Sequence, residues 1–254
     1  MPLFTDGPIS SIEDLTAQDS QLPTVASVEG IDVTQKIAIA QEMVAMDLHT
    51  ALNRFGSAGQ LFWLAPQPNL DRVVVTPPLK LWHTARSLEL VYADAYNSQL
   101  NDRYAGKRDQ FHALGKWAYE KLIEIGAGIA AQPVPRARRP TVAAFPGALA
   151  DGMYYVTTTW VNASGEEGAA AIETVICTTS STFLVGPATA PQIAAGWNVY
   201  AGVSTDMMFA QNTSLLLLGQ TWEQPAVLAQ SGERPGRGQK PTYLQALPRI
   251  LQRG

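Results

Sequence analysis

The sequence has few of the residues and patterns that mark several common classes of protein. Its 254 residues include one cysteine, Cys177, so no disulfide can form within the chain. The three histidines, His49, His83 and His112, are too far apart for a zinc motif and are interpreted as ordinary surface or packing residues. No apolar run approaches the roughly 18 residues of a membrane helix, and the N-terminus has no signal-peptide pattern. These absences predict a soluble protein without a membrane segment, made in a reducing compartment.

The sequence also lacks a recognisable catalytic constellation. Cys177 alternates with strand-forming residues and carries no cue for activation, so we expect a buried structural thiol. The adjacent Glu166 and Glu167 lie in a glycine-rich turn and are interpreted as residues that keep the turn solvated. The net charge of −4 does not favour general binding to nucleic acid or membranes. We therefore predict a protein that is not an enzyme, with no catalytic residues, no cofactor and no metal site.

Lysine and arginine are missing between Arg139 and Arg234, and this gap coincides with a change of pattern. Before the gap, apolar residues recur at steps of three and four, which predicts helices. After it, short runs of alternating β-branched and aromatic residues are separated by turn residues, which predicts strands. The stretch between them, AQPVPRARRPTVAAFPG at residues 131–147, is rich in proline and arginine.

The helical half contains three long apolar stripes, at residues 31–55, 81–95 and 111–125. Thr76, followed by two prolines, is a helix-start signal, and Gly126 is a plausible C-cap. Gly106 lies between the second and third stripes, so the segment is either two helices or one helix bent at that point. A short helix around SIEDL, capped by Ser11, precedes the stripes. Helices of this length can bury a small bundle core.

The strand half begins with MYYVTTTWVN and continues with AIETVICTT, STFLVG, GWNVYAG and TWEQP. Several short strands about ten residues apart predict a β-sandwich rather than a parallel sheet. Trp160, Trp197 and Trp222 are spread over these strands and are expected in its core. Because this half has no lysine or arginine, its faces are not suited to clamping phosphates.

The resulting fold class is α+β. It has an N-terminal α-helical bundle at residues 1–132, a Pro/Arg hinge at 133–140, a β-sandwich at 141–230 and an extended basic tail at 231–254. The prolines of PVPRARRP favour an extended spacer between the two folded parts. The hinge arginines either meet acidic neighbours or DNA, or are simply solvated.

Two groups of residues carry a resemblance to a known family. In the helical half they are TAQDSQLPTVASVEGIDVTQKIAIAQEM and LKLWHTARSLELVYADAYNSQLNDRYAGKRDQFHALGKWAYEKLIEIGAGIAAQPVPRA, with DAYNSQLNDRYAGKRDQF the most specific part. They resemble head–tail connector (neck adaptor) proteins of tailed bacteriophages. In the strand half, TTTWVNASGEEG, GWNVYAG, FAQN, LGQTWEQP and the ending LQRG resemble the immunoglobulin-like or fibronectin-III-like domain attached to some of these connectors.

The resemblance implies a structural protein of the virion neck, synthesised in the host cytoplasm. The helical part would form a homo-oligomeric ring, commonly of twelve copies, below the portal protein of the capsid. Genomic DNA would pass through the channel without sequence-specific contacts. The sandwich would decorate the ring or contact other neck or tail proteins, although minimal adaptors lack such a domain.

Two sets of candidate binding residues follow from the charged segments. Arg103, Lys107 and Arg108 lie in the run NSQLNDRYAGKRDQ, which suits a contact between subunits and equally suits a solvated helix face. The tail combines apolar anchors with basic residues, so it is suited to ordering on the portal; the alternative is a frayed, solvated tail. The tail residues expected to dock are Arg234, Arg237, Lys240, Tyr243, Leu247, Ile250 and Leu251.

A carbohydrate-binding or host-surface recognition module of a phage tail is the alternative function. In that case Trp197, Tyr200 and Trp222 would be the aromatic side chains that stack on sugars. Aromatic residues that alternate within strands are more often part of a core than of a binding platform.

Overall fold

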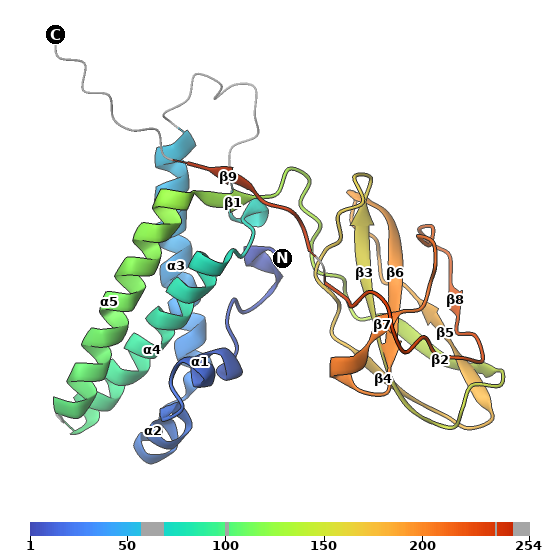
Figure 1. Ribbon diagram of the computed structural model, residues 1–254, viewed down its shortest axis with the longest axis horizontal. Coiled ribbons are helices and arrows are strands. Elements are labelled where there is room, and N and C mark those ends of the chain that lie inside the picture. Colours follow the sequence, from blue (N-terminus) through green and yellow to red (C-terminus); the bar gives the residue numbers. More distant parts are fainter. Residues whose placement is uncertain (57–68, 100–101, 237, 246–254) are drawn as a thin grey trace, which may run out of the picture. The chain divides into compact units, whose positions relative to one another are not determined.

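The computed structural model describes residues 1–56, 69–99, 102–236 and 238–245 (Figure 1). It confirms an α+β chain in which helices come first and antiparallel sheets follow. Two compact units are present. The helical unit comprises Gly7–Ile129 and the segment that starts at Thr242, and the β unit comprises Met1–Asp6 and Ala130–Pro241. The chain therefore passes from one unit to the other three times, rather than once at a central hinge.

Among the residues that the structure describes, the helical unit contains five α-helices, and its three longest helices carry the three predicted apolar stripes. Ser11 caps the first helix, where its hydroxyl accepts from the Asp14 amide and the Asp14 carboxylate accepts from the Ser11 amide. Gly106 lies inside the fifth helix, so it marks neither a break nor an end. The helices are α1 (Ile12–Gln18), α2 (Leu22–Glu29), α3 (Val33–Gly56), α4 (Pro77–Gln99) and α5 (Asp102–Ile125), with a 3₁₀ turn at Leu70–Arg72.

Helix α4 is the central element of this unit. It packs against α5, α3, α1 and α2, and its side chains are buried on several sides, including polar ones such as His83 and Ser87. Figure 1 shows α3 and α5 running in the same direction, with α4 antiparallel to both. The apolar core at the end of the unit near α1 and α2 includes Leu15, Leu22, Ile37, Leu88, Tyr92 and Phe111.

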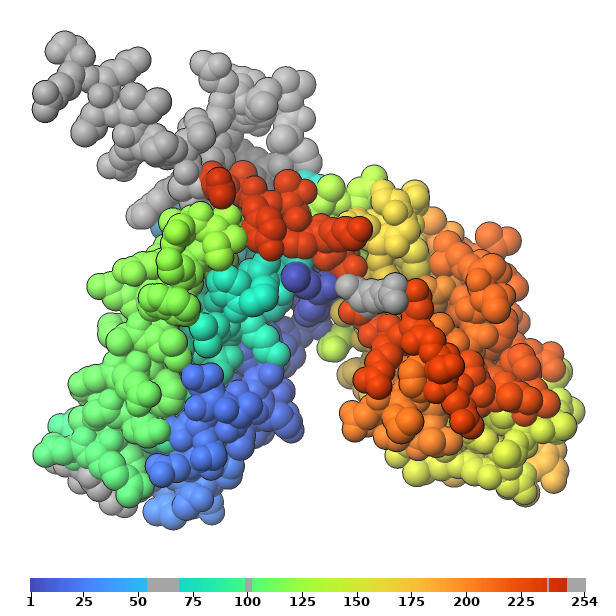
Figure 2. All heavy atoms as spheres, in the orientation of Figure 1, coloured from blue at the N-terminus to red at the C-terminus, as the bar shows by residue number. Residues whose placement is uncertain are grey.

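A small sheet, absent from the sequence-based prediction, follows α5. Gly126 ends α5 with φ +104° and an amide bond to the Leu122 carbonyl, as a C-cap does. The next residues form β1 (Ala127–Ile129), which pairs antiparallel with β9 (Thr242–Leu244). A Cβ at Gly126 would lie 2.8 Å from the Leu244 carbonyl oxygen, so the glycine is needed for this close approach. In Figure 2 the red C-terminal segment lies on the end of green α5, where the Gln245 side chain donates to the Ile125 carbonyl.

The β unit consists of two antiparallel sheets that share one core. One sheet has the order β2-β5-β8 and the other β4-β3-β6-β7. Phe183 and Val185 of one sheet and Trp160, Trp197 and Val199 of the other are in the same buried cluster. The strands are β2 (Thr141–Pro146), β3 (Gly152–Asn162), β4 (Thr174–Thr178), β5 (Ser181–Gly186), β6 (Ala194–Gly202), β7 (Phe209–Ala210) and β8 (Trp222–Glu223).

The predicted Pro/Arg hinge at residues 133–140 is packed into the β unit and is not a free spacer. Val134 and Ala137 are buried in its core. The amide of Arg136 donates to the Asp6 carboxylate at 2.6 Å, which fastens the N-terminal residues to this segment. Apolar residues between the prolines and arginines explain the difference, because they gain more from burial than from extension in water.

The first part of the predicted tail is also held by the β unit. The side chain of Gln239 is buried and makes both backbone hydrogen bonds of Val134, accepting from its amide at 2.7 Å and donating to its carbonyl at 3.0 Å. The Gln239 side chain therefore fastens this part of the tail to the segment that was predicted as a hinge.

The prediction of a buried thiol at Cys177 is wrong, because Cys177 is exposed. It lies on β4, an edge strand, directly opposite Met153 of β3. Alternation places Val175 and Cys177 on the outer face of the sheet, while Ile176 packs against the core. The period-two pattern is present in the sequence, but it does not show which of its two faces is inward.

Replacing Gln239 tests whether the C-terminal segment holds the β unit together. Gln239→Ala leaves the buried amide and carbonyl of Val134 without partners, so we expect the free energy of unfolding to fall by about 2 kcal/mol. Urea denaturation followed by tryptophan fluorescence measures this change. The control is Gln220→Ala, which removes an exposed hydrogen bond. Equal stability of the two variants would show that Gln239 does not help to hold the β unit together.

Candidate functional site

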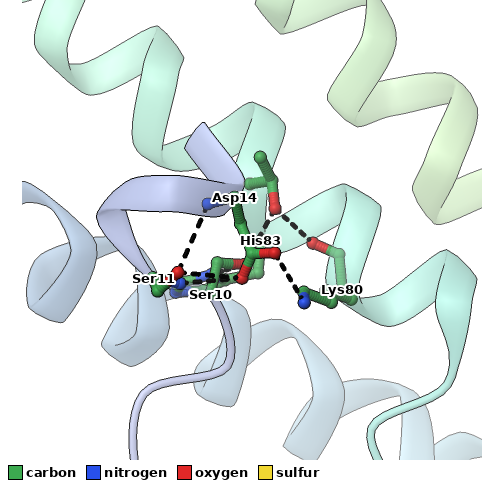
Figure 3. A network of polar contacts seen from close by, with 6 residues as sticks. Ser10, Ser11, Asp14, Lys80 and His83 are labelled. Atoms are coloured by element: carbon green, nitrogen blue, oxygen red, sulfur yellow. Dashed lines mark hydrogen bonds and ion pairs between the residues drawn. The ribbon is translucent and has the colours of Figure 1, made fainter. Parts of the chain in front are cut away.

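The most buried polar cluster of the helical unit surrounds His83 of α4 (Figure 3). The imidazole Nδ1 lies 2.9 Å from the Ser10 hydroxyl, and Nε2 lies 3.2 Å from the carbonyl oxygen of Ile37 in α3. The Ser10 hydroxyl also contacts the Thr84 hydroxyl at 2.8 Å. His83 is 0% exposed, and Ser10 and Thr84 are buried with it. The cluster therefore joins the segment before α1, helix α3 and helix α4.

The partners of His83 fix its tautomer. A carbonyl can only accept, so Nε2 carries the proton and donates to Ile37, and Nδ1 accepts from the Ser10 hydroxyl. Burial lowers the pKa of His83 to about 4, although the hydrogen bond to the Ile37 carbonyl opposes that decrease. His83 is therefore neutral at neutral pH.

A serine–histidine pair is the arrangement of a nucleophile and its base, but this one lacks access to a substrate. Both side chains are buried, and the second imidazole nitrogen is bound to a backbone carbonyl rather than to an orienting carboxylate. Nearby, the Lys80 ammonium of α4 pairs with the Asp14 carboxylate of α1 at 2.8 Å. The cluster is a clamp that fixes α1 and α3 on α4.

A second polar cluster joins the α1–α2 junction to α4 and α5. The Asp19 carboxylate accepts from the Tyr92 hydroxyl at 2.6 Å, from the Lys107 ammonium at 3.1 Å and from the Gln21 amide at 3.1 Å. Asp19 is only 4% exposed. Burial opposes its ionisation, but these hydrogen bonds and the Lys107 charge outweigh burial, so the pKa of Asp19 is lowered. Asp19 in turn helps burial to raise the pKa of Tyr92.

The three residues predicted at a subunit interface make contacts within their own chain. Lys107 binds Asp19 and lies over the Phe111 ring. Arg108 pairs with Asp109 at 2.8 Å and lies over the Tyr96 ring, and Arg103 lies over the Tyr104 ring. Charge reversal at Lys107 would leave a buried carboxylate facing a negative charge, so that substitution would perturb the fold and cannot serve as an interface test.

The third cluster lies in the β unit and corrects the interpretation of Glu167. Glu167 is 7% exposed, and its carboxylate accepts hydrogen bonds from the Thr159 hydroxyl and, at 2.5 Å, from the Tyr200 hydroxyl. Burial and the bond to Glu167 raise the pKa of Tyr200. Glu166 keeps the expected turn role, because its side chain accepts from Asn162 at the same turn. The sequence of two adjacent glutamates in a turn does not show which of them is buried against β3 and β6.

The predicted docking residues of the tail fall into three places. Arg234 lies over the Phe209 ring of the β unit, and the Lys240 amide donates to Glu166. Tyr243 belongs to β9 and is exposed. Arg237, Leu247, Ile250 and Leu251 lie outside the described residues.

The aromatic residues proposed as a sugar platform are largely unavailable. Trp197 and Tyr200 are buried, and the Trp197 indole donates to the Leu217 carbonyl at 3.0 Å. Trp222 is partly buried against the core of the β unit. These side chains are packing residues, as the simpler interpretation of alternating aromatics predicts.

No protein-family model matches the sequence, and no curated protein matches it. Over the described ranges, no cluster of three or more His, Cys, Asp and Glu side chains could hold a metal ion. Within the same ranges, no helix is both long and apolar enough to span a membrane.

The buried His83 predicts a loss of stability in mild acid. In the unfolded chain its pKa returns to the ordinary 6.5, so between pH 6.5 and about 4 the unfolded state binds a proton that the folded state does not. The contribution of the neutral imidazole to the free energy of unfolding is therefore fully present above pH 6.5. It is lost as the pH falls, by about 3 kcal/mol at pH 4. We expect His83→Gln to show a correspondingly weaker pH dependence of unfolding by urea. The same pH dependence in both proteins would contradict the burial of a neutral imidazole.

The Asp19 cluster predicts a large difference between two lysines of α5. Lys107→Met removes a partner of a buried carboxylate and should cost about 1 to 2 kcal/mol of unfolding free energy. The control, Lys121→Met, removes an exposed pair with Glu124 and should cost less than about 0.5 kcal/mol. Thermal unfolding followed by circular dichroism at 222 nm, a wavelength dominated by helix, compares the two. A larger loss for Lys121→Met than for Lys107→Met would refute the role of Lys107.

Proposed function

We propose that this protein is a structural component of a phage virion, a head–tail connector that forms a ring below the portal and links the capsid to the tail. Genomic DNA passes through the ring without sequence-specific contacts. The helical unit builds the ring, and the β unit contacts other neck or tail proteins. The ring has twelve copies, as the resemblance implies.

The observation that carries this proposal is the α4–α5 pair. The most connector-like sequence, DAYNSQLNDRYAGKRDQF, covers the end of α4 and the first half of α5. Its conspicuous residues have defined roles there: Tyr104 and Phe111 are buried in the core, and Lys107 fastens α5 to Asp19. The resembling residues therefore build a helical pair rather than a chemical site, which supports an assembly function.

The topology of the β unit supports an immunoglobulin-like domain. In such domains one sheet contains strands A, B, E and D, and the other contains G, F and C, with C′ beside C in the larger variants. The order β4-β3-β6-β7 corresponds to C′-C-F-G, and the pair β2–β5 corresponds to B–E. Strand β8 takes the place of strand D. Trp160 on β3 then matches the buried tryptophan that is typical of strand C.

The composition of the β unit favours a protein neighbour over DNA. Between Pro140 and Glu233 the sequence has acidic residues but no lysine or arginine. Its exposed apolar side chains include Phe145, Met153 and Val175. The faces built by the strands of this range therefore offer no positive charge to the phosphate backbone and suit contact with another neck or tail component, whereas the basic residues of the β unit, among them Arg136, Arg139 and Arg234, lie in the flanking segments.

Binding to the portal ring tests the proposal. The purified protein, mixed with the portal ring of the same phage and imaged by negative stain, should add a ring of density below the portal. The tail is tested by truncation after Gln245, which keeps β9 and Gln239 in place and removes only residues 246–254. If the tail docks, this variant binds more weakly than the full chain. A full chain that leaves the portal unchanged would refute the connector function.

A further inference from the structure

The two outer helices of the helical unit each expose a continuous stripe of residues at heptad spacing. On α3 the stripe follows steps of four and three residues, and we call it the α3 stripe: Gln35, Ile39, Glu42, Met46, His49 and Asn53. On α5 it follows the same kind of steps, and we call it the α5 stripe: Gly106, Gln110, Ala113, Trp117, Glu120 and Glu124. All twelve residues are exposed. Steps that alternate between three and four keep residues on one side of a helix, as in the seam of a coiled coil.

Each stripe has a large apolar side chain near its middle. Met46 is 63% exposed and Trp117 is 50% exposed. Trp117 is flanked along its stripe by the small Ala113, with Gly106 further along, so another helix could approach the α5 backbone closely. Tryptophan is among the residues most often found at the energetic centre of protein interfaces. Neither side chain is among the buried core residues of the helical unit, to which α3 and α5 contribute other residues such as Ile37 and Phe111.

We propose that the α3 stripe of one copy of this chain packs in parallel against the α5 stripe of the next copy, with Met46 against Trp117. The inference rests on the proposed function, whose ring requires a surface on each copy that fits a different surface on its neighbour. Rotation about the ring axis keeps the direction of each helix relative to that axis the same in every copy. Because α3 and α5 run in the same direction (Figure 1), they meet as parallel helices.

Charge complementarity favours a second copy of the chain as the partner, and it favours the alignment that places Met46 opposite Trp117. With Met46 opposite Trp117, His49 lies opposite Glu120 one step further along both stripes. Asp47 follows Met46 and Lys116 precedes Trp117, and in a parallel pair these two flanks lie on the same side of the seam. Asp47 and Lys116 are exposed and have no ion pair among the residues described by the structure. In the proposed pair, Asp47 of one copy lies near Lys116 of the next, so each of these charges gains a neighbour of opposite sign.

The two alternatives with like helices are less favourable. A parallel, in-register α5–α5 contact would bring Glu120 and Glu124 of both copies together, and a parallel α3–α3 contact would do the same with Glu42. Like charges across a seam oppose association, so the mixed pair is preferred. A mixed pair also leaves one free stripe at each end of a dimer, and association continues until the ring closes.

Cysteine cross-linking tests the contact in the full-length chain. In a Cys177→Ser background, Met46→Cys together with Trp117→Cys should give a ladder of covalent oligomers beyond the dimer on a non-reducing gel. Each cysteine alone should give monomer, because its partner in the neighbouring copy is absent. A covalent dimer from either single cysteine would show a like-helix contact and overturn the proposal, as would monomer alone from the double variant.

Charge exchange provides a second readout that does not depend on cysteine. Asp47→Lys and Lys116→Asp should each weaken self-association about tenfold in sedimentation velocity, and the combined variant should recover most of it. Trp117→Ala should also weaken self-association, whereas its control Val227→Ala, which removes an exposed apolar side chain of the β unit, should leave self-association unchanged. No recovery in the combined variant would overturn the register.

These outcomes are separable from the connector function itself. Portal binding with no cross-linked ladder would refute the α3–α5 contact and leave the connector function standing. A cross-linked ladder without portal binding would refute the connector function and leave the α3–α5 contact standing.

Discussion

The burial of α4 on several sides is the constraint on which the helical unit depends. A helix in that position has to satisfy polar side chains that water cannot reach, and it does so through its neighbours. His83 is satisfied by Ser10 and by a carbonyl of α3, and Tyr92 by Asp19, which also binds Lys107 of α5. Each of these bonds fixes a different element on α4. The inner faces of α3 and α5 are therefore occupied by contacts within the helical unit, and their outer faces remain available for other contacts.

The β unit is held by a different kind of constraint, the pairing of chain segments that are far apart in the sequence. Asp6 is fastened to Arg136, Gln239 to Val134, and further along the chain β9 pairs with β1 in the helical unit. Both ends of the described chain are thus used to complete the folded units. Segments that look like linkers in the sequence are structural parts, and these include much of the predicted tail.

Much of the fold was accessible from local patterns, because those patterns act through local physics. The stripes of α3, α4 and α5, the capping box at Ser11 and the C-cap at Gly126 are signals that a short window of sequence contains. The long-range contacts were not accessible. No short stretch of sequence shows that Ser10 contacts His83, which is 73 positions away. In the same way, no short stretch shows that Glu167 is buried or that Cys177 is exposed. The α3 and α5 stripes proposed as an interface were inaccessible for the same reason, because the sequence alone does not show that Lys107 of the charged run binds Asp19 or which faces of α3 and α5 are exposed.

A cryo-electron microscopy reconstruction of the assembled ring tests the central claim, that the outer helices of the helical unit join neighbouring copies. The account predicts that α3 of each copy lies beside α5 of the next, parallel to it, with Met46 and Trp117 in contact. A ring in which neighbouring copies meet through their β units, with α3 and α5 both facing solvent, would contradict it.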